Sequence, residues 1–409
     1  KIFKDTFIVM ISNIINYAGM FVLAVMITRM LGVDALGEFT LIFAISSILT
    51  SVNEFGFSTL LVRKINDDRK DVFTVLNNVN TFKILFGAII IFFASLIIYL
   101  IPGNGLSIAL AAGLAIVIPK SIQTSYEASL RALMKQVFSA VLKSINTLIQ
   151  IVLAYIMLVN SFDLFSILAM ILIAEILTTL IFKFQNRSIW INVLDHQYSR
   201  VSFNLKNLVG LLKESWLFLA NNFLTISMPR INILIIGYMI SQAAVGIFSA
   251  ASRIVSSIGL LSGALFNTYY PALINLKDKP NEQFRFTSRI LAYSLIAGLL
   301  INALLYLLSG IIIDLTFKID EAKLILKILS FTVLPILLSS VLKAFFYAYF
   351  KENYLFILFI VWWIFNIIIG YIFIYYGGII GFAYSSLITE FLFFFILFLK
   401  YYKEKNKLD

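Results

Sequence analysis

The residues best placed to do chemistry are charged side chains that lie inside long apolar segments. The cations are Arg29, Lys83, Lys120, Lys143, Arg230, Arg253 and Lys343, and the carboxylates are Glu54, Glu127, Glu175 and Glu390. A charge near the centre of a bilayer costs about 2.5–3.5 kcal/mol on insertion scales, so such groups usually face a wet cavity or a partner. Arginine can hold a phosphate through two parallel hydrogen bonds. A desolvated carboxylate can instead carry a proton or a cation.

Several other kinds of chemistry lack suitable residues. The chain has no cysteine and a single histidine, His196, so neither a thiolate nor a multi-histidine metal centre is possible. It has no Gly-x4-Gly-Lys-Ser/Thr phosphate loop, which excludes a fused ATPase of that type. We therefore expect no catalytic residues, no metal and no cofactor.

The elements that must position these charges are membrane-spanning helices. Of the 409 residues, 61% are hydrophobic and 13% are charged, whereas soluble chains are nearer half apolar and a quarter charged. Apolar runs of roughly 20 residues match a bilayer core about 30 Å thick. We predict an all-α polytopic membrane protein with about twelve helices, near 7–31, 38–62, 81–101, 106–129, 137–160, 164–184, 213–238, 244–271, 290–313, 324–348, 354–376 and 379–399. Turns are predicted at Pro102–Gly105 and at Gly377-Gly378.

The distribution of basic residues predicts the orientation. With a cytoplasmic N-terminus, 22 of the 32 Lys and Arg residues lie inside, 4 lie outside and the others lie within helices. This positive-inside bias places both termini in the cytoplasm of a multi-pass protein in the inner (plasma) membrane. It also explains the net charge of +11 better than nucleic-acid binding does. The first apolar segment is too long for a cleavable signal peptide and has no small-residue cleavage site.

The chain also contains an internal repeat. Shifting the first half by about 209 residues places Asn13 on Asn222 and Gly37 on Gly246, and a shift of 216 places Pro119 on Pro335. A repeat of six helices keeps its topology, so the repeat is parallel, about a pseudo-two-fold axis along the membrane normal. We predict an N-lobe at 1–190, a cytoplasmic linker at 191–212 with a possible amphipathic piece on the membrane surface, and a C-lobe at 213–409. A central cavity between the lobes would open to each side alternately.

Two stretches carry a resemblance to a known family. The first comprises Arg29–Phe39 (RMLGVDALGEF), Glu54–Ser58 (EFGFS) and Val62-Arg63; the second comprises Arg230–Gly237 (RINILIIG), Ala244–Arg253 (AVGIFSAASR) and Tyr270-Pro271. Both resemble the Wzx-type flippases of polysaccharide (O-antigen or capsule) repeat units, in the multidrug/oligosaccharidyl-lipid/polysaccharide exporter superfamily. Lipid II flippases of that superfamily usually have two further helices, and multidrug extruders usually lack the Arg-x-Leu-Gly signature.

The resemblance implies a transporter that flips undecaprenyl-diphosphate-linked oligosaccharides from the cytoplasmic to the outer leaflet by alternating access. Its partners would be this lipid-linked cargo, membrane lipids, and the polysaccharide polymerase and chain-length regulator of the same pathway. Two alternatives stay open: an ion-coupled multidrug or small-molecule antiporter of the same superfamily, and a membrane polysaccharide polymerase. The polymerase usually has a large outer loop, whereas the longest outer segment here, about 314–323, is short.

A diphosphate cargo requires cationic groups in the cavity. Arg230 and Arg253 lie deepest in their predicted helices, and Pro229 beside Arg230 would kink its helix, as cavity walls often do. The charges deep in the membrane sum to zero in the N-lobe and to +2 in the C-lobe, where Lys343 adds to the arginines. We therefore predict that the C-lobe supplies more of the anion-holding charge, with Lys120 and Arg29 opposite. Buried pairing within a lobe is the alternative for both arginines.

The other charged residues have more modest or alternative predicted roles. Glu54, Glu175 and Glu390 are candidate proton or cation carriers, and a static salt bridge is the alternative. Glu127 either pairs with Arg131 four residues later or joins the site, while Lys343 could pair across the lobe interface. Lys83 and Lys143 lie near helix ends, where snorkelling to the interface is expected.

Two prolines occupy equivalent places in the repeat. Pro119 lies in the fourth predicted helix and Pro335 in the tenth. They either let these helices bend during alternation or form a fixed kink.

Overall fold

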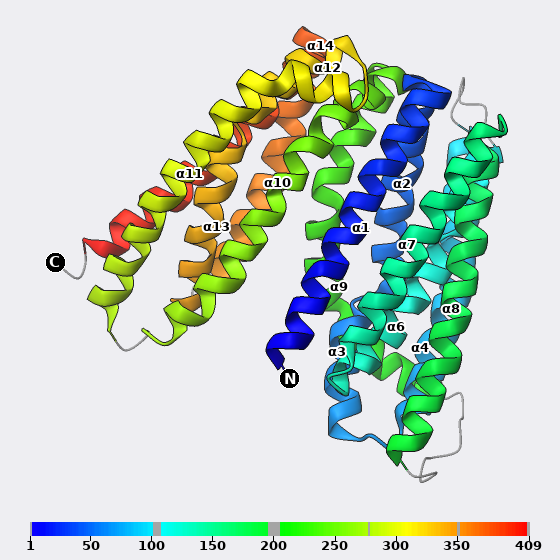
Figure 1. Ribbon diagram of the computed structural model, residues 1–409. Helices are drawn as coiled ribbons and strands as arrows, with labels where there is room; N and C mark the ends of the chain where they lie inside the picture. Colours follow the sequence, from blue (N-terminus) through cyan, green and yellow to red (C-terminus); the bar gives the residue numbers. More distant parts are fainter. Residues whose placement is uncertain (1, 101–107, 195–204, 277–278, 350–351, 407–409) are drawn as a thin grey trace. The chain divides into compact units, whose positions relative to one another are not determined.

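The computed structural model describes residues 2–100, 108–194, 205–276, 279–349 and 352–406, and within these ranges every regular element is a helix. The helices are α1 (Ile2–Leu31), α2 (Val33–Glu54), α3 (Phe57–Asp67), α4 (Val72–Leu100), α5 (Ile108–Ala115), α6 (Val117–Ala132), α7 (Gln136–Val159), α8 (Leu164–Leu194), α9 (Leu205–Met239), α10 (Gln242–Ile274), α11 (Pro280–Leu315), α12 (Asp320–Ser330), α13 (Val333–Ala348) and α14 (Glu352–Lys405) (Figure 1). The predicted turn at Pro102–Gly105 and the histidine His196 lie outside the described residues.

The prediction of an all-α polytopic membrane protein is confirmed. Ten stretches of the described residues are long and apolar enough to cross a membrane. One of them contains α14, which reverses direction at Gly378, where φ is 55° and ψ is −142°. The two arms of α14 are antiparallel neighbours, since a Cβ on Gly381 would lie 2.1 Å from the carbonyl oxygen of Phe373. With α14 counted as two spans and α5–α6 as one, the predicted twelve are present.

Several predicted helix ends were wrong, all in the same direction. α4 begins at Val72 rather than near 81, α8 continues to Leu194 rather than ending near 184, and α11 begins at Pro280 rather than near 290. Hydropathy marks only the part of a helix that crosses the hydrocarbon, whereas the backbone hydrogen bonds continue into the polar interface. For the same reason α8 and α9 occupy both ends of the predicted linker at 191–212, whose residues 195–204 lie outside the described ranges.

Two pairs of short helices each form one predicted span, and a proline explains the break in both. Pro119 is the third residue of α6, and Pro335 is the third residue of α13. Proline has no N–H to donate to the carbonyl four residues earlier, and its ring crowds that carbonyl. α5 therefore ends at Ala115, and α12 ends at Ser330. The prolines thus lie just after a helix break rather than in the middle of a kinked helix.

The helix boundaries repeat with the offsets found in the sequence. α6 and α13 both begin and end 216 residues apart, and so do the starts of α7 and α14. The start of α2 and the start of α10 are 209 residues apart. Repetition of helix ends is independent of residue identity, so it supports the internal repeat more strongly than the matched residues do.

The chain forms two compact units. The first contains Lys1–Gly32 and Phe39–Arg230, and the second contains Val33–Glu38 and Ile231–Asp409. In the first unit α1 packs along α7, and a core around Phe57, Tyr126 and Trp190 joins α3, α4, α6 and α8 (Figure 1). In the second unit, α10, α11, α13 and α14 surround a core rich in aromatic rings, including Phe284 and Phe345. The predicted lobes at 1–190 and 213–409 remain a prediction about which helices move together.

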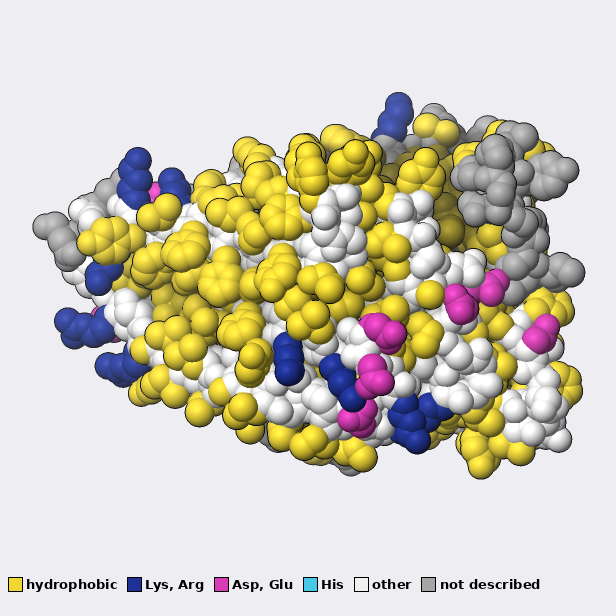
Figure 2. All heavy atoms as spheres, turned by 90° about the horizontal axis from the view of Figure 1, so that it is seen from above, with side chains coloured by type: hydrophobic (Ala, Val, Ile, Leu, Met, Phe, Trp, Pro, Cys, Tyr) yellow, Lys and Arg dark blue, Asp and Glu magenta, His cyan; other side chains and the backbone are white. Residues whose placement is uncertain are grey.

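The surface is apolar to a degree that only lipid permits. Figure 2 shows one face on which hydrophobic side chains predominate, while acidic and basic side chains gather in a few groups. Leu307 and Leu315 are more than 70% exposed, as suits residues that face acyl chains.

Candidate functional site

A cavity of about 410 Å³ lies within the first unit and contains two of the predicted cations. α2, the start of α3, α5, α6 and α9 form its wall. Its lining residues are Ile42, Phe43, Ser46, Ser47, Thr50, Ser51, Glu54, Ser58, Gly113, Ile116, Lys120, Thr124, Asn222, Ile226 and Arg230. Apart from its charged groups, the wall is mostly hydroxyl and aliphatic side chains, and many of the hydroxyls donate to backbone carbonyls. Thus Ser46 donates to the Gly113 carbonyl at 2.8 Å, and Thr50 donates to the Ser46 carbonyl at 2.6 Å.

Arg230 brings an unused hydrogen-bond donor to this cavity. It lies in α9 directly after Pro229, which is inside the helix and cannot donate to the carbonyl of Thr225. Its Nε atom is buried and has no hydrogen-bond partner among the described residues. Buried donors are nearly always satisfied in folded proteins, so an orphaned one in a cavity indicates a missing acceptor.

Lys120 lies in the first turn of α6, directly after Pro119. Its Nζ is 3.8 Å from Glu175 Oε1 and 5.4 Å from the ring centre of Phe43. The side chain is 36% exposed. The ion pair is therefore loose, and the ammonium keeps access to the cavity. Lys120 and Arg230, which the sequence assigned to different lobes, lie in one compact unit.

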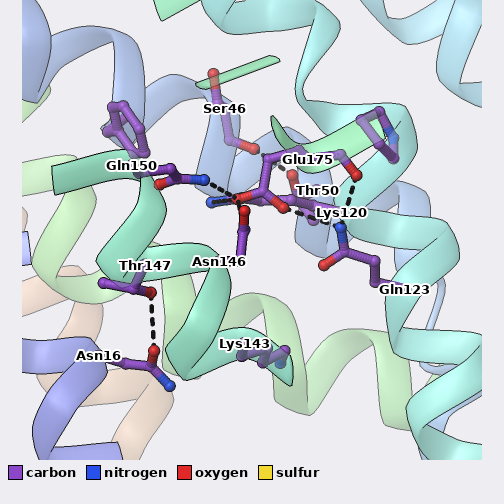
Figure 3. Close-up of polar contacts among 12 residues, drawn as sticks. Asn16, Ser46, Thr50, Lys120, Gln123, Lys143, Asn146, Thr147, Gln150 and Glu175 are labelled. Atoms are coloured by element: carbon purple, nitrogen blue, oxygen red, sulfur yellow. Dashed lines mark hydrogen bonds and ion pairs between the residues drawn. The ribbon is translucent and has the colours of Figure 1, made fainter. Parts of the chain in front are cut away.

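Glu175 of α8 is held by donors from two neighbouring helices. Gln123 Nε2 of α6 donates to its Oε2 at 2.9 Å, and Gln150 Nε2 of α7 donates to its Oε1 at 3.2 Å. Asn146 Nδ2 of α7 lies 3.4 Å from the same Oε1. Figure 3 shows these amide side chains converging on the carboxylate, whose Oε1 is also the atom nearest to Lys120 Nζ. The three amides and Lys120 hold the carboxylate in place, and the contact to Lys120 matches the salt-bridge alternative.

Glu54 has a structural role that the sequence did not indicate, because it caps the start of a helix. Its carboxylate accepts the backbone N–H groups of Gly56, at 2.9 Å, and of Ser58, and the side-chain amide of Asn222 at 3.1 Å. These backbone groups belong to the first turn of α3, so Glu54 caps that helix where its dipole favours an anion. Among the described residues it forms no ion pair within 4.0 Å, and the salt-bridge alternative is wrong for this residue.

The break that Glu54 caps requires a glycine. Gly56 has φ 73°, and a Cβ there would lie 2.5 Å from the backbone nitrogen of Leu219 in α9. The close approach of the two backbones brings Asn222 to Glu54.

Snorkelling is wrong for Lys83. The side chain is fully buried, and its Nζ donates to the Ser121 carbonyl at 2.7 Å, to Ser125 Oγ at 2.8 Å and to Thr124 Oγ1 at 3.0 Å. A lysine reaches water only when its stem points outward, and this one points into the packing between α4 and α6.

Of the two alternatives for Glu127, the pair with Arg131 is wrong. Glu127 pairs with Lys143 at 2.5 Å rather than with Arg131, whose guanidinium donates to the Ser58 carbonyl at 3.4 Å. The pair to Lys143 joins α6 to α7, whereas a pair to Arg131 would stay within α6. Lys143 is therefore held by an acidic partner.

The remaining predicted site residues do not line this cavity. Arg29 is exposed at the end of α1. Arg253, in the second unit, donates through Nε to Ser249 Oγ at 3.2 Å. Lys343 of α13 and Glu390 of α14 are close enough for their charges to interact but form no ion pair within 4.0 Å.

Sequence reasoning missed the neutral members of the site. Gln123, Asn146, Gln150 and Asn222 hold the two carboxylates, yet only Asn222 attracted attention, and only as a repeat match. A carboxamide in an apolar helix is itself a signal, because it must find a partner within the membrane.

The fold is similar to those of solved membrane transporters and flippases, one of which is described as a member of the MOP superfamily. The chain is similar to an inward-facing multidrug resistance transporter of the MATE family, with a TM-score of 0.70 and 14% identity over 97% of this chain and 96% of that one. It is also similar to the lipid II flippase MurJ in an inward closed conformation, with a TM-score of 0.72 and 17% identity over 97% and 87% of the two chains. A MATE transporter of Vibrio cholerae gives a TM-score of 0.60 at 13% identity over 99% and 96%.

A family model described as "Polysaccharide biosynthesis protein" matches residues 2–277. The chain belongs to this family of polysaccharide biosynthesis proteins, which confirms the resemblance found in the sequence. No curated protein sequence matches the chain.

Proposed function

We propose that the protein flips undecaprenyl-diphosphate-linked oligosaccharides from the cytoplasmic to the outer leaflet of the plasma membrane by alternating access. The observation that carries this proposal is the buried, unpartnered Nε of Arg230 in the same cavity as Lys120. A diphosphate offers several anionic oxygens, which both cations can bind through charge-assisted hydrogen bonds. The family and the similarity to a lipid II flippase agree with a lipid-linked cargo.

The charge of the cavity argues against a cationic drug as cargo. Lys120 and Arg230 face one carboxylate in the lining, Glu54. That carboxylate is already held by two backbone N–H groups and an amide, so little of its charge is left for a ligand. An anionic cargo gains from this imbalance, whereas a cationic one loses.

Three predicted cations outside this cavity are candidates for further contacts with the cargo. Arg253 and Lys343 of the second unit and Arg29 of α1 are candidates for holding other parts of the cargo. Among the carboxylates, Glu390 is the better candidate for proton or cation coupling, since it has no hydrogen-bond partner among the described residues, whereas Glu175 is held by several donors. The polysaccharide polymerase and the chain-length regulator would act on the flipped product.

The test is an Arg230→Ala variant in cells that lack the natural copy. Flipping is measured as the fraction of lipid-linked oligosaccharide that an impermeant, glycan-oxidising reagent reaches from outside. We expect cargo to accumulate in the inner leaflet and surface polysaccharide to be lost. Arg131→Ala, which removes an arginine outside the cavity, is the matched control and should retain export.

Two results would contradict the proposal. One is unchanged access to the cargo in Arg230→Ala cells, with the variant present at normal levels in the membrane. The other is normal export of the polysaccharide in cells from which the gene for this protein has been deleted, combined with loss of resistance to a cationic drug. The second result would favour the multidrug antiporter.

A further inference from the structure

The first unit contains a second cavity, of about 430 Å³. It is formed by α4, α6 and α8, and α6 packs against each of the other two (Figure 1). α6 contributes Ile122 and Tyr126 to its wall, whereas Lys120 and Thr124 of the same helix line the first cavity. Its lining residues are Phe73, Leu76, Asn77, Asn80, Thr81, Ile84, Ile122, Tyr126, Thr179, Leu180, Lys183, Asn186 and Arg187. The volume is within the range of about 300–1,000 Å³ that is typical of ligand sites.

One end of this groove is basic. Lys183 and Arg187 are exposed and lie four residues apart on α8, so their side chains are neighbours on one helix face. Neither has a hydrogen-bond or ion-pair partner in the described part of the chain, and no acidic residue lines the groove. Two adjacent like charges repel each other, and an anion between them would turn this repulsion into attraction.

The same end holds an unsatisfied polar atom. Asn80 of α4 lines the groove, and its amide oxygen is buried with no hydrogen-bond partner among the described residues. A ligand that carries hydroxyl donors beside its anionic group would satisfy this oxygen and the two cations together.

The other end of the groove is apolar and open to lipid. Ile84 and Leu180 line it and are 48% and 43% exposed. Leu85 and Phe184, next to them in the chain, are 61% and 68% exposed. In a membrane these surfaces contact acyl chains, so the groove runs from a lipid-facing apolar wall to a basic, polar end.

The basic end lies where phospholipid headgroups are found. Asn77 and Asn80 are in the second and third turns of α4, which begins at Val72. The positive-inside bias places the N-terminal end of α4 and the C-terminal end of α8 on the cytoplasmic side of the membrane. Basic pockets between helices on this side of a membrane recognise anionic lipid headgroups.

We propose that this groove binds the headgroup of an anionic phospholipid of the inner leaflet. Lys183 and Arg187 bind the phosphate, Asn80 accepts a hydrogen bond from a headgroup hydroxyl, and an acyl chain lies along Ile84 and Leu180. Phosphatidylglycerol has all three features, whereas phosphatidylcholine has neither the net charge nor the hydroxyl. The site does not depend on the cavity of Lys120 and Arg230, nor on what the protein transports.

The test counts bound lipids by native mass spectrometry of the full-length protein in detergent, with added phosphatidylglycerol or phosphatidylcholine. We expect preferential binding of phosphatidylglycerol. In the double variant Lys183→Gln/Arg187→Gln, its affinity should fall about tenfold or more, because each basic residue contributes to attraction of anionic lipid. Lys403→Gln/Lys405→Gln removes two charges from the end of α14 and is the matched control, which should bind as the wild type does. An unchanged thermal midpoint in both variants shows that they are folded.

Three outcomes would overturn the proposal. Equal binding of the two lipids would show that charge is not recognised. An equal loss of affinity in the α14 control would indicate general attraction to basic loops rather than a site. Displacement of bound phosphatidylglycerol by low concentrations of undecaprenyl diphosphate would identify the cargo lipid, not a membrane phospholipid, as the occupant. Since Arg230→Ala leaves this groove intact, lipid binding and flipping can fail independently.

Discussion

The helices α6 and α13 have the same length and the same proline position, but they bury different kinds of side chain. Both contain 16 residues, both have proline as the third residue, and both end in a turn before the next helix. The buried residues of α6 include Ser121, Gln123, Ser125 and Ser129, whereas those of α13 are mainly leucine, valine and phenylalanine. Where α6 has Lys120, the repeat places Ile336 in α13.

The two interiors hold their units together in different ways. α6 is joined to its neighbours by hydrogen bonds, from Lys83 on one side and from Gln123 to Glu175 on another. α13 is joined by aromatic packing, in which Phe345 lies 4.8 Å from Phe284 and 5.0 Å from Tyr401, measured between ring centres. Burial from water contributes little between helices in lipid, so polar bonds and close packing are the two available means. The polar solution also leaves Lys120 beside a cavity, at the position where the repeat places Ile336 in α13.

The largest effect should come from removing the charge that distinguishes α6. We expect Lys120→Ala to lower the flipping rate about tenfold to a hundredfold, the usual range for loss of a hydrogen bond to a charged group. Ile336→Ala removes the repeat-equivalent side chain of α13 and should change the rate less than twofold. Both are measured by accessibility of the cargo from outside. Equal losses in the two variants would mean that helix packing, not charge, explains the effect of Lys120.

The second effect concerns the two carboxylates that the repeat relates, Glu175 and Glu390. Glu175→Gln places an amide among donors that already point at this site, so we expect a loss of about 1.5–3 kcal/mol in the free energy of unfolding. Glu390→Gln breaks no hydrogen bond among the described residues and should change stability little. Denaturant unfolding of the two purified variants checks this difference. If Glu390→Gln were the more destabilising variant, the second unit would also depend on polar interactions of a buried carboxylate.

How far the sequence predicts this molecule depends on the kind of feature. The spans, the repeat and the turn at Gly377-Gly378 follow from apolar length and from glycine and proline, because lipid leaves the backbone few choices. The partners of the charged side chains do not follow. Lys83 was expected at the interface and is fully buried, since its partners on α6 lie about 40 residues further along the chain. Pairing across helices depends on rotation about each helix axis, which apolar periodicity does not fix to within one residue.

A third, smaller effect tests the repeat within the second unit. Gly37 and Gly246 are repeat equivalents and face each other: a Cβ on Gly37 would lie 1.9 Å from the Gln242 carbonyl oxygen, and one on Gly246 would lie 2.3 Å from the Val33 carbonyl oxygen. Either glycine changed to alanine should lower stability by about 1–2 kcal/mol, as overpacking does. Because the contact is symmetric, the two losses should be similar.

The control for these variants is Gly310→Ala in α11. Among the described residues, no atom outside the adjoining backbone of α11 lies within 4 Å of the added Cβ, so the better helix propensity of alanine should leave stability unchanged or slightly higher. Thermal unfolding of the three purified variants checks the order. A large loss from only one of the two paired glycines would show that the contact is not used symmetrically.

The smallest effect is expected at a turn where the two halves of the repeat use different chemistry. In the first half, Asp163 Oδ1 accepts the backbone N–H of Ser166 at 3.0 Å and its hydroxyl at 2.6 Å, and so caps α8, whereas the equivalent turn of α14 uses Gly378 and no carboxylate. These hydrogen bonds from Ser166 lower the pKa of the exposed Asp163.

A lowered pKa in the folded state means that the stabilisation of α8 by Asp163 is present at neutral pH. It is lost as the pH falls below about 3.9, the unfolded value, and through the folded value. Asp163→Ala should therefore cost less than about 1 kcal/mol at pH 7 and nothing at low pH. Denaturant unfolding of wild type and variant at several pH values measures this difference, and a gap that widens in acid would show that the carboxylate does not stabilise α8 in its ionised form.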